Sequence, residues 1–172
     1  KTAPIQAEGF PSIRTPNIER GRFILEDVNR VSLDTYRKWT KRALPREDDL
    51  ILAREAPVGN VAIIKKNQKF CLGQRTVLIR PNKKKIDPKF LLYYLLSENI
   101  QNNFLSRSIG STVAHLNMSD IRNLKMINIP DAKTQIKIGE ILQNYNELIE
   151  KNFEKIKTLE KIILLTYENY FE

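Results

Sequence analysis

The sequence predicts an α+β protein in which a compact, mixed α/β body is followed by a long C-terminal coiled-coil helix. In the body, short apolar runs are separated by turn residues, which is typical of short strands. From residue 131 onward, apolar residues instead recur at alternating spacings of three and four, which is typical of a paired helix. The charge changes at the same place: residues 1–130 hold 23 Lys and Arg against 12 Asp and Glu, whereas residues 131–172 hold 6 against 8. We therefore expect one domain over residues 1–130 and a long helix over residues 131–172.

Short strands account for the expected sheet of the body. The first 29 residues contain Pro4, Pro11 and Pro16, and long helices are disfavoured there because each proline fixes φ and removes a backbone donor. Strands this short, separated by turns, predict a mixed sheet or a partly closed barrel. The expected extended segments are Ser12–Arg14, Arg22–Leu25, Leu50–Ala53, Val61–Ile64, Phe70–Leu72, Thr76–Arg80 and Lys125–Ile129.

Three helices are expected within the body, and the last is a short one that begins at Ser119 with Asp120 in its first turn. The first covers Leu33–Lys41, where Asp34 is a candidate cap. The second begins at Asp87 and Pro88, because an aspartate can cap a helix and a proline suits its first turn. Apolar residues continue at helical spacing over Phe90–Ile100, which predicts one continuous helix there.

The predicted C-terminal helix carries an apolar seam that is typical of helix pairing. Most of the seam positions are Ile, Leu or Tyr, over about four and a half heptads. Asn152 interrupts the seam, and a buried amide there would fix the register of a helix pair, because other alignments leave it without a partner. The expected pairing interface consists of Ile138, Leu142, Tyr145, Ile149, Asn152, Ile156, Leu159, Ile163 and Tyr170.

The length and width of this helix indicate a partner outside the body. A helix of this length would measure roughly 60 Å, more than twice the radius of gyration of about 14 Å that is expected for the body. Ile141, Leu148, Ile162 and Leu165 widen the apolar stripe, so that it could cover the body as well as a partner helix. We expect part of the stripe to contact another chain or another domain.

The body carries the whole basic excess of the chain, whose formal net charge is +9. A basic unit on a nearly neutral helix favours a polyanion partner, nucleic acid first, although net charge also serves solubility. Arg, Gln and Asn near loops suit base edges because their forked groups match guanine and adenine, whereas lysine runs suit phosphates. The candidate DNA-binding residues are Arg14, Asn17, Arg37, Lys38, Arg54, Lys65, Lys66, Gln74, Arg75, Lys83, Lys84, Lys85 and Arg107.

Residues that could carry catalysis are few. The single cysteine, Cys71, excludes an intrachain disulfide and suits a cytoplasmic protein, and with the single histidine, His115, it leaves too few soft ligands for zinc. No apolar run approaches the ~20 residues that span a bilayer, so we expect no membrane partner. Asp48, Asp49 and Glu55 leave a small metal-dependent nuclease open as an alternative, and the seam leaves open a free-standing dimeric DNA-binding regulator. We expect no catalytic residue and no metal in this chain.

Several stretches, taken in order, form a more specific pattern than any one of them. They are Ile13–Ile18 with Gly21, Asp49–Gly59, Leu72–Thr76, Gly110–Asn117, Ile121–Pro130, and a long helix with Gln135 and Ile136 near its start. With these stretches, which cover nearly the whole chain, the sequence resembles the DNA-specificity subunits of type I restriction–modification enzymes.

The resemblance implies a protein that recognises double-stranded DNA and catalyses nothing itself. Such subunits carry two target-recognition domains, each followed by a long helix, and the two helices pack antiparallel to hold the domains apart. Each domain reads one half of a bipartite site. Modification subunits methylate adenine with S-adenosylmethionine, and a motor and nuclease subunit adds cleavage that uses ATP and Mg²⁺. These cofactors are therefore expected on the partner subunits.

The chain differs from the family pattern in being half as large. One target-recognition domain and one helix imply half a subunit, which would pair with a second half or with a copy of itself through the C-terminal helix. The resemblance also implies that an opening strand of the domain is missing before Lys1. It places Ser111 and Thr112 in a loop before the last short helix of the body, as further candidates for DNA contact.

Overall fold

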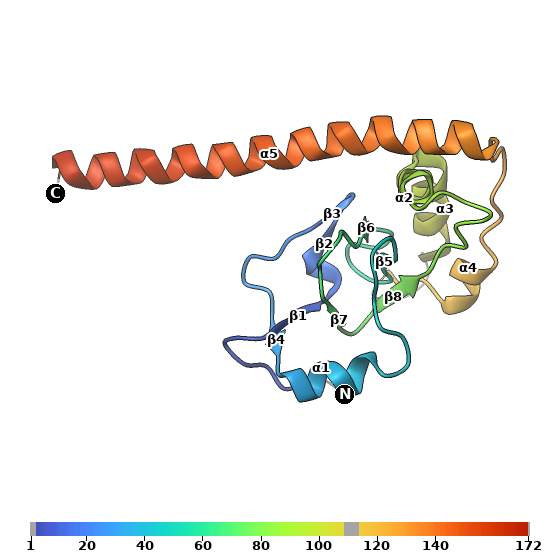
Figure 1. Cartoon of the computed structure of the whole chain (residues 1–172), viewed down its shortest axis with the longest axis horizontal. Coiled ribbons are helices and arrows are strands. Elements are labelled where there is room, and N and C mark those ends of the chain that lie inside the picture. The colour runs from blue at the N-terminus through green and yellow to red at the C-terminus, as the bar shows by residue number, and fades with distance from the viewer. Residues whose placement is uncertain (1–2, 109–113, 172) are drawn as a thin grey trace.

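The protein folds into a body of short strands and helices that lies along one long helix, α5 (Ala132–Phe171) (Figure 1). This computed structural model of the 172-residue chain describes residues 3–108 and 114–171. Within those two ranges, no helix is both long and apolar enough to cross a membrane. The expected α+β class with a long C-terminal helix is confirmed.

The centre of the body is a three-stranded antiparallel sheet in the order β6-β5-β8. β5 (Leu50–Ala53) pairs with β6 (Val61–Ile63) on one side and with β8 (Thr76–Ile79) on the other. All of β5 is buried, and its side chains alternate between two cores on the two faces of the sheet. The apolar runs therefore predicted these three strands to within one residue at their ends.

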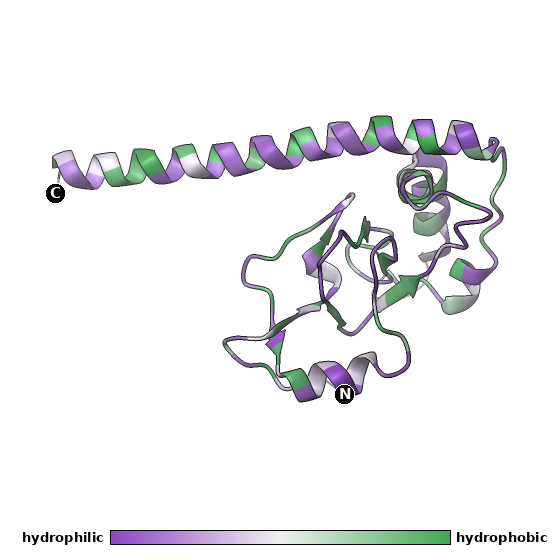
Figure 2. Cartoon of the chain, viewed as in Figure 1, coloured by the Kyte–Doolittle hydropathy of each residue, from purple (hydrophilic) through white to green (hydrophobic). Residues whose placement is uncertain are grey.

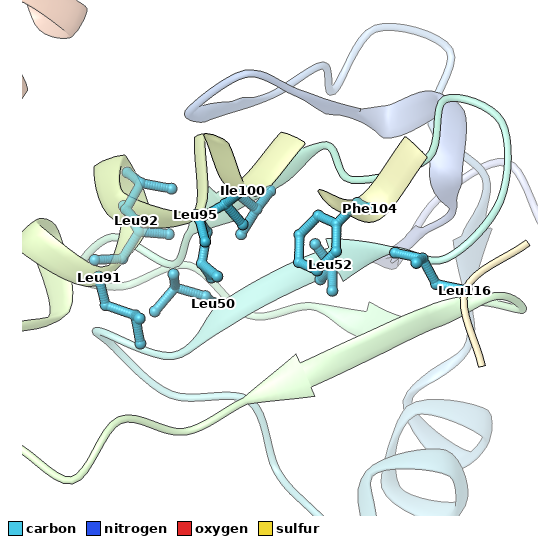
Figure 3. Close-up of a cluster of buried hydrophobic side chains, with 10 residues drawn as sticks. Leu50, Leu52, Leu91, Leu92, Leu95, Ile100, Phe104 and Leu116 are labelled. Atoms are coloured by element: carbon cyan, nitrogen blue, oxygen red, sulfur yellow. The ribbon is translucent and has the colours of Figure 1, made fainter. Parts of the chain in front are cut away.

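Two helices cover one face of this sheet. α2 (Pro88–Leu96) begins at Asp87, whose carboxylate accepts a hydrogen bond from the Phe90 amide at 2.8 Å, as expected of a cap. α3 (Glu98–Ser108) follows after a break at Ser97. The side chains that close this core include Leu50, Leu52, Leu91, Leu92, Leu95, Ile100, Phe104 and Leu116 (Figure 3).

The break at Ser97 contradicts the single helix expected over Phe90–Ile100. The Ser97 backbone is extended, with ψ of 148°. Its amide and its hydroxyl both donate to the Tyr94 carbonyl, at 3.2 and 2.7 Å, and so close the last turn of α2. The helical periodicity continues across the break because α3 buries Phe104 in the same core as α2.

The other face of the central sheet meets a second sheet of three strands, in the order β4-β1-β7. β1 (Phe10–Ile13) runs antiparallel to β4 (Arg30–Val31) and parallel to β7 (Cys71–Leu72). The sequence predicted a mixed sheet or a partly closed barrel, and the pairing of β1 is mixed. Because β1 and β7 are parallel, the two strands end at the same edge of the sheet.

α1 (Leu33–Thr40) packs against β7, on the side of the body away from α5 (Figure 1). Its cap is Ser32 rather than Asp34, because the Thr35 amide donates to Ser32 Oγ at 3.2 Å. Asp34 lies instead in the first turn, where a carboxylate favours the positive end of the helix dipole.

A hairpin and two short helices complete the body. β2 (Ile18–Glu19) and β3 (Arg22–Phe23) form the hairpin, and the Gly21 amide between them donates to the edge of β6 at 2.9 Å. The 3-10 helix η1 (Thr15–Asn17) precedes the hairpin, and α4 (Met118–Arg122) follows residues 114–117.

The segment Lys125–Ile129 is not the strand that its apolar residues predicted. The Tyr94 hydroxyl accepts a hydrogen bond from the Ile127 amide at 2.9 Å and donates one to the Ile127 carbonyl at 3.2 Å. A single side chain of α2 therefore satisfies backbone groups that a neighbouring strand would otherwise pair.

The first half of α5 contacts the body through a polar face, whereas its apolar stripe faces away. The buried residues of this polar face are Gln135, Gly139, Gln143 and Asn146. Ile141 and Leu148 are 47% and 54% exposed, so the expectation that the widened stripe covers the body is wrong. Apolar and polar segments alternate along α5 as far as its C-terminal end (Figure 2).

At its start, α5 is joined to α2 by side-chain hydrogen bonds. Gln135 Oε1 accepts from the Asp87 amide at 2.9 Å, and the Tyr93 hydroxyl donates to Gln143 Oε1 at 3.0 Å. Between these bonds lies Gly139, where an added Cβ would sit 2.9 Å from the Asp87 carboxylate. The absence of a side chain at this residue is what allows the two helices to approach so closely.

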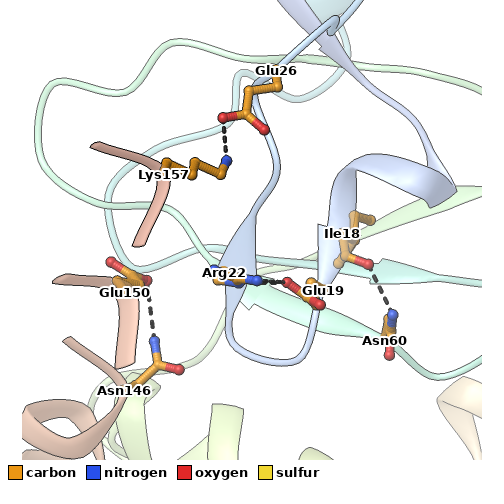
Figure 4. A network of polar contacts seen from close by, with 8 residues as sticks. All are labelled: Ile18, Glu19, Arg22, Glu26, Asn60, Asn146, Glu150 and Lys157. Carbon is orange, nitrogen blue, oxygen red and sulfur yellow. Dashed lines mark hydrogen bonds and ion pairs between the residues drawn. The ribbon is translucent and has the colours of Figure 1, made fainter. Parts of the chain in front are cut away.

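Farther along, α5 contacts the β2–β3 hairpin and the turn that follows it, where Glu26 faces Lys157 (Figure 4). The Arg22 guanidinium pairs with Glu19 and lies 4.1 Å from the centroid of the Phe153 ring on α5. Lys157 forms an ion pair with Glu26. Beyond this pair, α5 extends past the body with its side chains exposed (Figure 1).

Candidate nucleic-acid interface

The ends of β1 and β7 bring two of the predicted DNA-reading residues together. Ile13 pairs with Leu72, and the Gly73 amide donates to the Ile13 carbonyl at 2.8 Å. Because the two strands are parallel, Arg14 and Gln74 leave the same edge of the sheet, and both are exposed. Neither side chain has a hydrogen-bonding partner among the residues that the structure describes.

The adjoining helix α1 carries two exposed cations. Arg37 and Lys38 lie on the surface of α1, which packs against β7, and their neighbour Trp39 lines a cavity together with Arg14 and Gln74. Within residues 3–108 and 114–171, neither cation forms an ion pair. We call the residues Arg14, Arg37, Lys38 and Gln74 the reading edge.

Arg75 follows the reading edge directly and belongs to a network that fastens residues 114–117 to the end of β5. Arg75 Nη1 lies 2.5 Å from Glu55 Oε2, and His115 Nδ1 lies 3.0 Å from Glu55 Oε1. Arg54 reaches His115 Nε2 at 2.7 Å and donates to the Leu116 carbonyl at 2.8 Å. Because arginine only donates, Nε2 accepts this bond and the Nδ1 proton is directed at Glu55.

Several other predicted DNA-binding residues are engaged in contacts within the chain. Lys65 pairs with Glu150 of α5 at 2.5 Å. Lys83 pairs with Asp48 at 2.5 Å, and this hydrogen bond raises the pKa of the Lys83 ammonium. Arg107 pairs with Asp120 at 3.6 Å. Asn17 completes a turn, in which its Oδ1 accepts from the Arg14 amide at 3.1 Å.

The predicted lysines that follow β6 and β8 lie at the opposite end of the central sheet from Arg75. β5 and β8 are antiparallel, with Leu50 opposite Ile79 and Ala53 opposite Thr76. The turn that contains Lys66, and the run that contains Lys84 and Lys85, therefore extend from the Leu50 end, whereas Arg75 precedes Thr76 at the other. The strand pairing thus separates Lys66, Lys84 and Lys85 from Arg75. Ser111 and Thr112 lie outside the described residues, and a DNA contact by any of the predicted residues stays a prediction.

The acidic residues do not converge on a metal site. Asp48 and Asp49 precede β5 whereas Glu55 follows it, so the strand separates them. Asp49 is buried and accepts two hydrogen bonds from Arg80, at 2.8 and 2.6 Å. In the part of the chain that the structure describes, no three His, Cys, Asp or Glu side chains are grouped to hold a metal ion. The arrangement gives no support to the nuclease alternative.

The surroundings of Cys71 and His115 do not favour a catalytic cysteine–histidine pair. Cys71 is buried in a core with Val31 and Tyr36, and burial raises the pKa of its thiol. Both ring nitrogens of His115 are engaged by Arg54 and Glu55, as described above. Cys71 therefore behaves as a small core residue.

The predicted pairing seam of α5 is open to solvent in the single chain. Leu142 is 37% exposed, Ile156 50% and Tyr170 81%. Asn152 is exposed as well, and Ile138 alone among the predicted seam residues is partly buried by the body. Such a row of exposed apolar side chains is typical of an interaction surface, although pairing itself stays a prediction.

Sequence reasoning missed the polar face of α5, which joins it to the body. Gln135, Gly139, Gln143 and Asn146 recur at spacings of four, four and three. This spacing places them on one side of a helix, so a second, polar stripe was readable beside the apolar one. A glycine within a long helix was the clearest signal, because it costs helix stability unless close packing requires it.

Comparison with known proteins identifies what the chain resembles over most of its length. The family described as type I restriction modification DNA specificity domain matches residues 3–161. The putative type I restriction enzyme MjaX specificity subunit of Methanocaldococcus jannaschii is 33% identical over 111 residues, which are 62% of this chain and 25% of that protein. The MjaIX specificity subunit of the same organism is 26% identical over 149 residues, which are 87% of this chain and 33% of that protein.

A bacterial relative and a solved structure extend the comparison. The EcoBI specificity subunit of Escherichia coli is 25% identical over 147 residues, which are 84% of this chain and 31% of that protein. A chain of a solved structure, from work on complex assembly and conformational transition of the type I R-M system, superposes on this chain with a TM-score of 0.54. It shares 18% identity over 94% of this chain and 38% of its own length, which shows a shared fold. The chain spans about a quarter to a third of the length of its curated relatives.

Proposed function

The chain belongs to the family of type I restriction–modification DNA specificity domains, and from this membership we propose that its body reads one half of a bipartite DNA site. The observation that carries the proposal is the reading edge. There, Arg14 and Gln74 leave adjacent ends of two parallel strands, and α1, which packs against β7, carries two exposed cations. Forked side chains suit base edges and flanking cations suit phosphates, so one edge offers both kinds of contact.

The proposal gives α5 the role of a spacer. Residues 1–130 form the target-recognition domain, and residues 131–172 form the helix that pairs with a second specificity half or with a copy of this chain. The exposed seam supports this division, and so does the polar face that holds the start of α5 against α2. Asn152 would fix the register of the pair.

Catalysis is assigned to partner subunits. Modification subunits would methylate adenine with S-adenosylmethionine at the site that this chain selects, and a restriction subunit would add cleavage that depends on ATP and Mg²⁺. The body contributes the choice of sequence and the helix contributes the spacing of two half-sites.

The charge of the reading edge provides a direct test of DNA binding. Changing Arg37→Ala and Lys38→Ala together should weaken binding to any duplex about 10-fold at low salt. It should also lower the dependence of log K on log salt concentration by about 0.9 for each phosphate that the variant no longer neutralises. Fluorescence anisotropy of a labelled duplex, titrated at several salt concentrations, measures both quantities.

The matched control removes the same charge from residues outside the predicted DNA contacts. The double variant Lys125→Ala and Lys133→Ala changes two exposed lysines, one after α4 and one in the first turn of α5, and it should bind duplex DNA nearly as tightly as the unaltered chain. Equal losses of affinity in the two double variants would place the interface elsewhere, and a binding constant independent of salt would contradict phosphate contact altogether.

A further inference from the structure

A cavity of about 210 Å³ opens between α1 and the joined ends of β1 and β7. Arg14 and Gln74 line it from the strand ends, Asn29 lines it from the residue before β4, and Trp39 lines it from α1. Ala3 and Ile5 also line it, so five segments that are separate in the sequence build the cavity. Neither Asn29 nor Trp39 was a predicted DNA-binding residue.

Gly73 shapes the cavity by letting Arg14 lie close to the end of β7. An added Cβ on Gly73 would sit 2.6 Å from Arg14 Cγ and 2.9 Å from the Ile13 carbonyl oxygen. A side chain at this residue would therefore push the stem of Arg14 away from the strand end. The glycine does not have a positive φ, so the close approach and not the backbone angle accounts for it.

The position of Asn29 is fixed through its backbone. Its carbonyl accepts a hydrogen bond from the Ser12 amide of β1 at 2.7 Å. In the described part of the chain, the side-chain amides of Asn29 and Gln74 have no hydrogen-bonding partner, so their donors and acceptors are open to a ligand. Trp39 supplies an apolar wall beside these polar groups.

We propose that this cavity receives the major-groove edge of one base pair, and that Trp39 and Asn29 determine sequence preference together with Arg14 and Gln74. This inference rests on the proposed function. Each base pair presents donors, acceptors or a thymine methyl group at its major-groove edge. A guanidinium, two amides and an indole are complementary to such an edge, and the lining within the described residues includes no lysine to favour a phosphate.

Selection from a pool of randomised duplexes tests the cavity with the whole chain. Gln74→Ala and Asn29→Ala should each relax the preference at one base-pair position by about 5- to 150-fold and leave the other positions as they are. Trp39→Ala should relax the same or the adjacent position. Because Trp39→Ala also removes packing from α1, Trp39→Phe serves as a second variant. It keeps an aromatic wall in the cavity and should retain part of the sequence preference.

The outcomes separate this inference from the proposed function. If the unaltered chain selects a sequence and the Gln74 and Asn29 variants select it with the same preference at every position, the cavity is not a reading pocket but the proposed function stands. Uniform weakening across all sequences would make the cavity a phosphate contact and overturn the inference as well. If the unaltered chain selects no sequence, the proposed function fails and the inference fails with it.

Discussion

Replacing Gly139 with leucine is expected to detach the first half of α5 from the body. A Cβ at this residue would lie 2.9 Å from the Asp87 carboxylate and 2.9 Å from the Phe90 amide nitrogen, which are the cap and first turn of α2. The added side chain must therefore separate the two helices and break the bonds from Asp87 to Gln135 and from Tyr93 to Gln143. We expect a loss of about 1–3 kcal/mol in the free energy of unfolding, from thermal or urea denaturation.

Asn144→Leu is the matched control, because Asn144 is exposed on α5 and the change introduces the same side chain. It should leave the stability within about 0.5 kcal/mol of that of the unaltered chain. A Gly139→Leu protein as stable as the control would show that α5 does not depend on this close approach.

The ionisation of Tyr93 is a second measure of whether α5 detaches from the body in Gly139→Leu. Burial raises the pKa of Tyr93 above its ordinary value, and the carboxylates of Glu150 and Glu147 raise it further. Since the folded-state pKa lies above the unfolded value of about 10, this tyrosine contributes stability that is complete below pH 10 and is lost as the pH rises beyond it. In Gly139→Leu, Tyr93 should become accessible to water, and the alkaline loss of stability should become smaller.

A charged substitution in the seam is expected to have the second large effect. Ile149 and Ile156 are each 50% exposed in the single chain, and a partner helix would bury them. Full burial of an isoleucine side chain stabilises by about 1.5–3 kcal/mol. Changing both residues to glutamate should therefore weaken pairing more than 100-fold, as measured by sedimentation equilibrium at micromolar concentrations.

The control for this prediction lies on another side of the same helix. Lys151→Glu and Thr158→Glu introduce the same residue away from the seam and should leave pairing almost unchanged, because both residues are exposed and outside the stripe. A strictly monomeric unaltered chain would contradict pairing between copies, and equal weakening in the two double variants would contradict the assigned seam.

Features that depend on local pattern were predictable from the sequence. The apolar run of β5, the Asp87 cap of α2 and the long periodicity of α5 each arise from residues near one another in the chain. Ser97 shows the limit, because the same apolar spacing continues through a serine that closes one helix and precedes another. Side-chain capping decided that boundary.

Features that depend on distant partners could not be predicted. Lys65 pairs with Glu150 of α5, 85 residues away in the sequence, and no local pattern indicates that contact. Arg54 contacts His115 and Leu116, which are also distant from it in the sequence, and DNA contact by either Lys65 or Arg54 stays a prediction. Arg14 and Gln74 were recognised one at a time, and only the parallel pairing of β1 with β7 brings them to one edge.

The central claim, that this chain selects a DNA sequence for methylation, is tested most directly by mapping methylated adenines across the genome of a host. Cells that carry the partner methyltransferase would be compared with and without the gene for this chain. The account predicts that one bipartite motif loses its methylation when the gene is removed and regains it when the gene is restored. An identical set of methylated sites in both strains would contradict it.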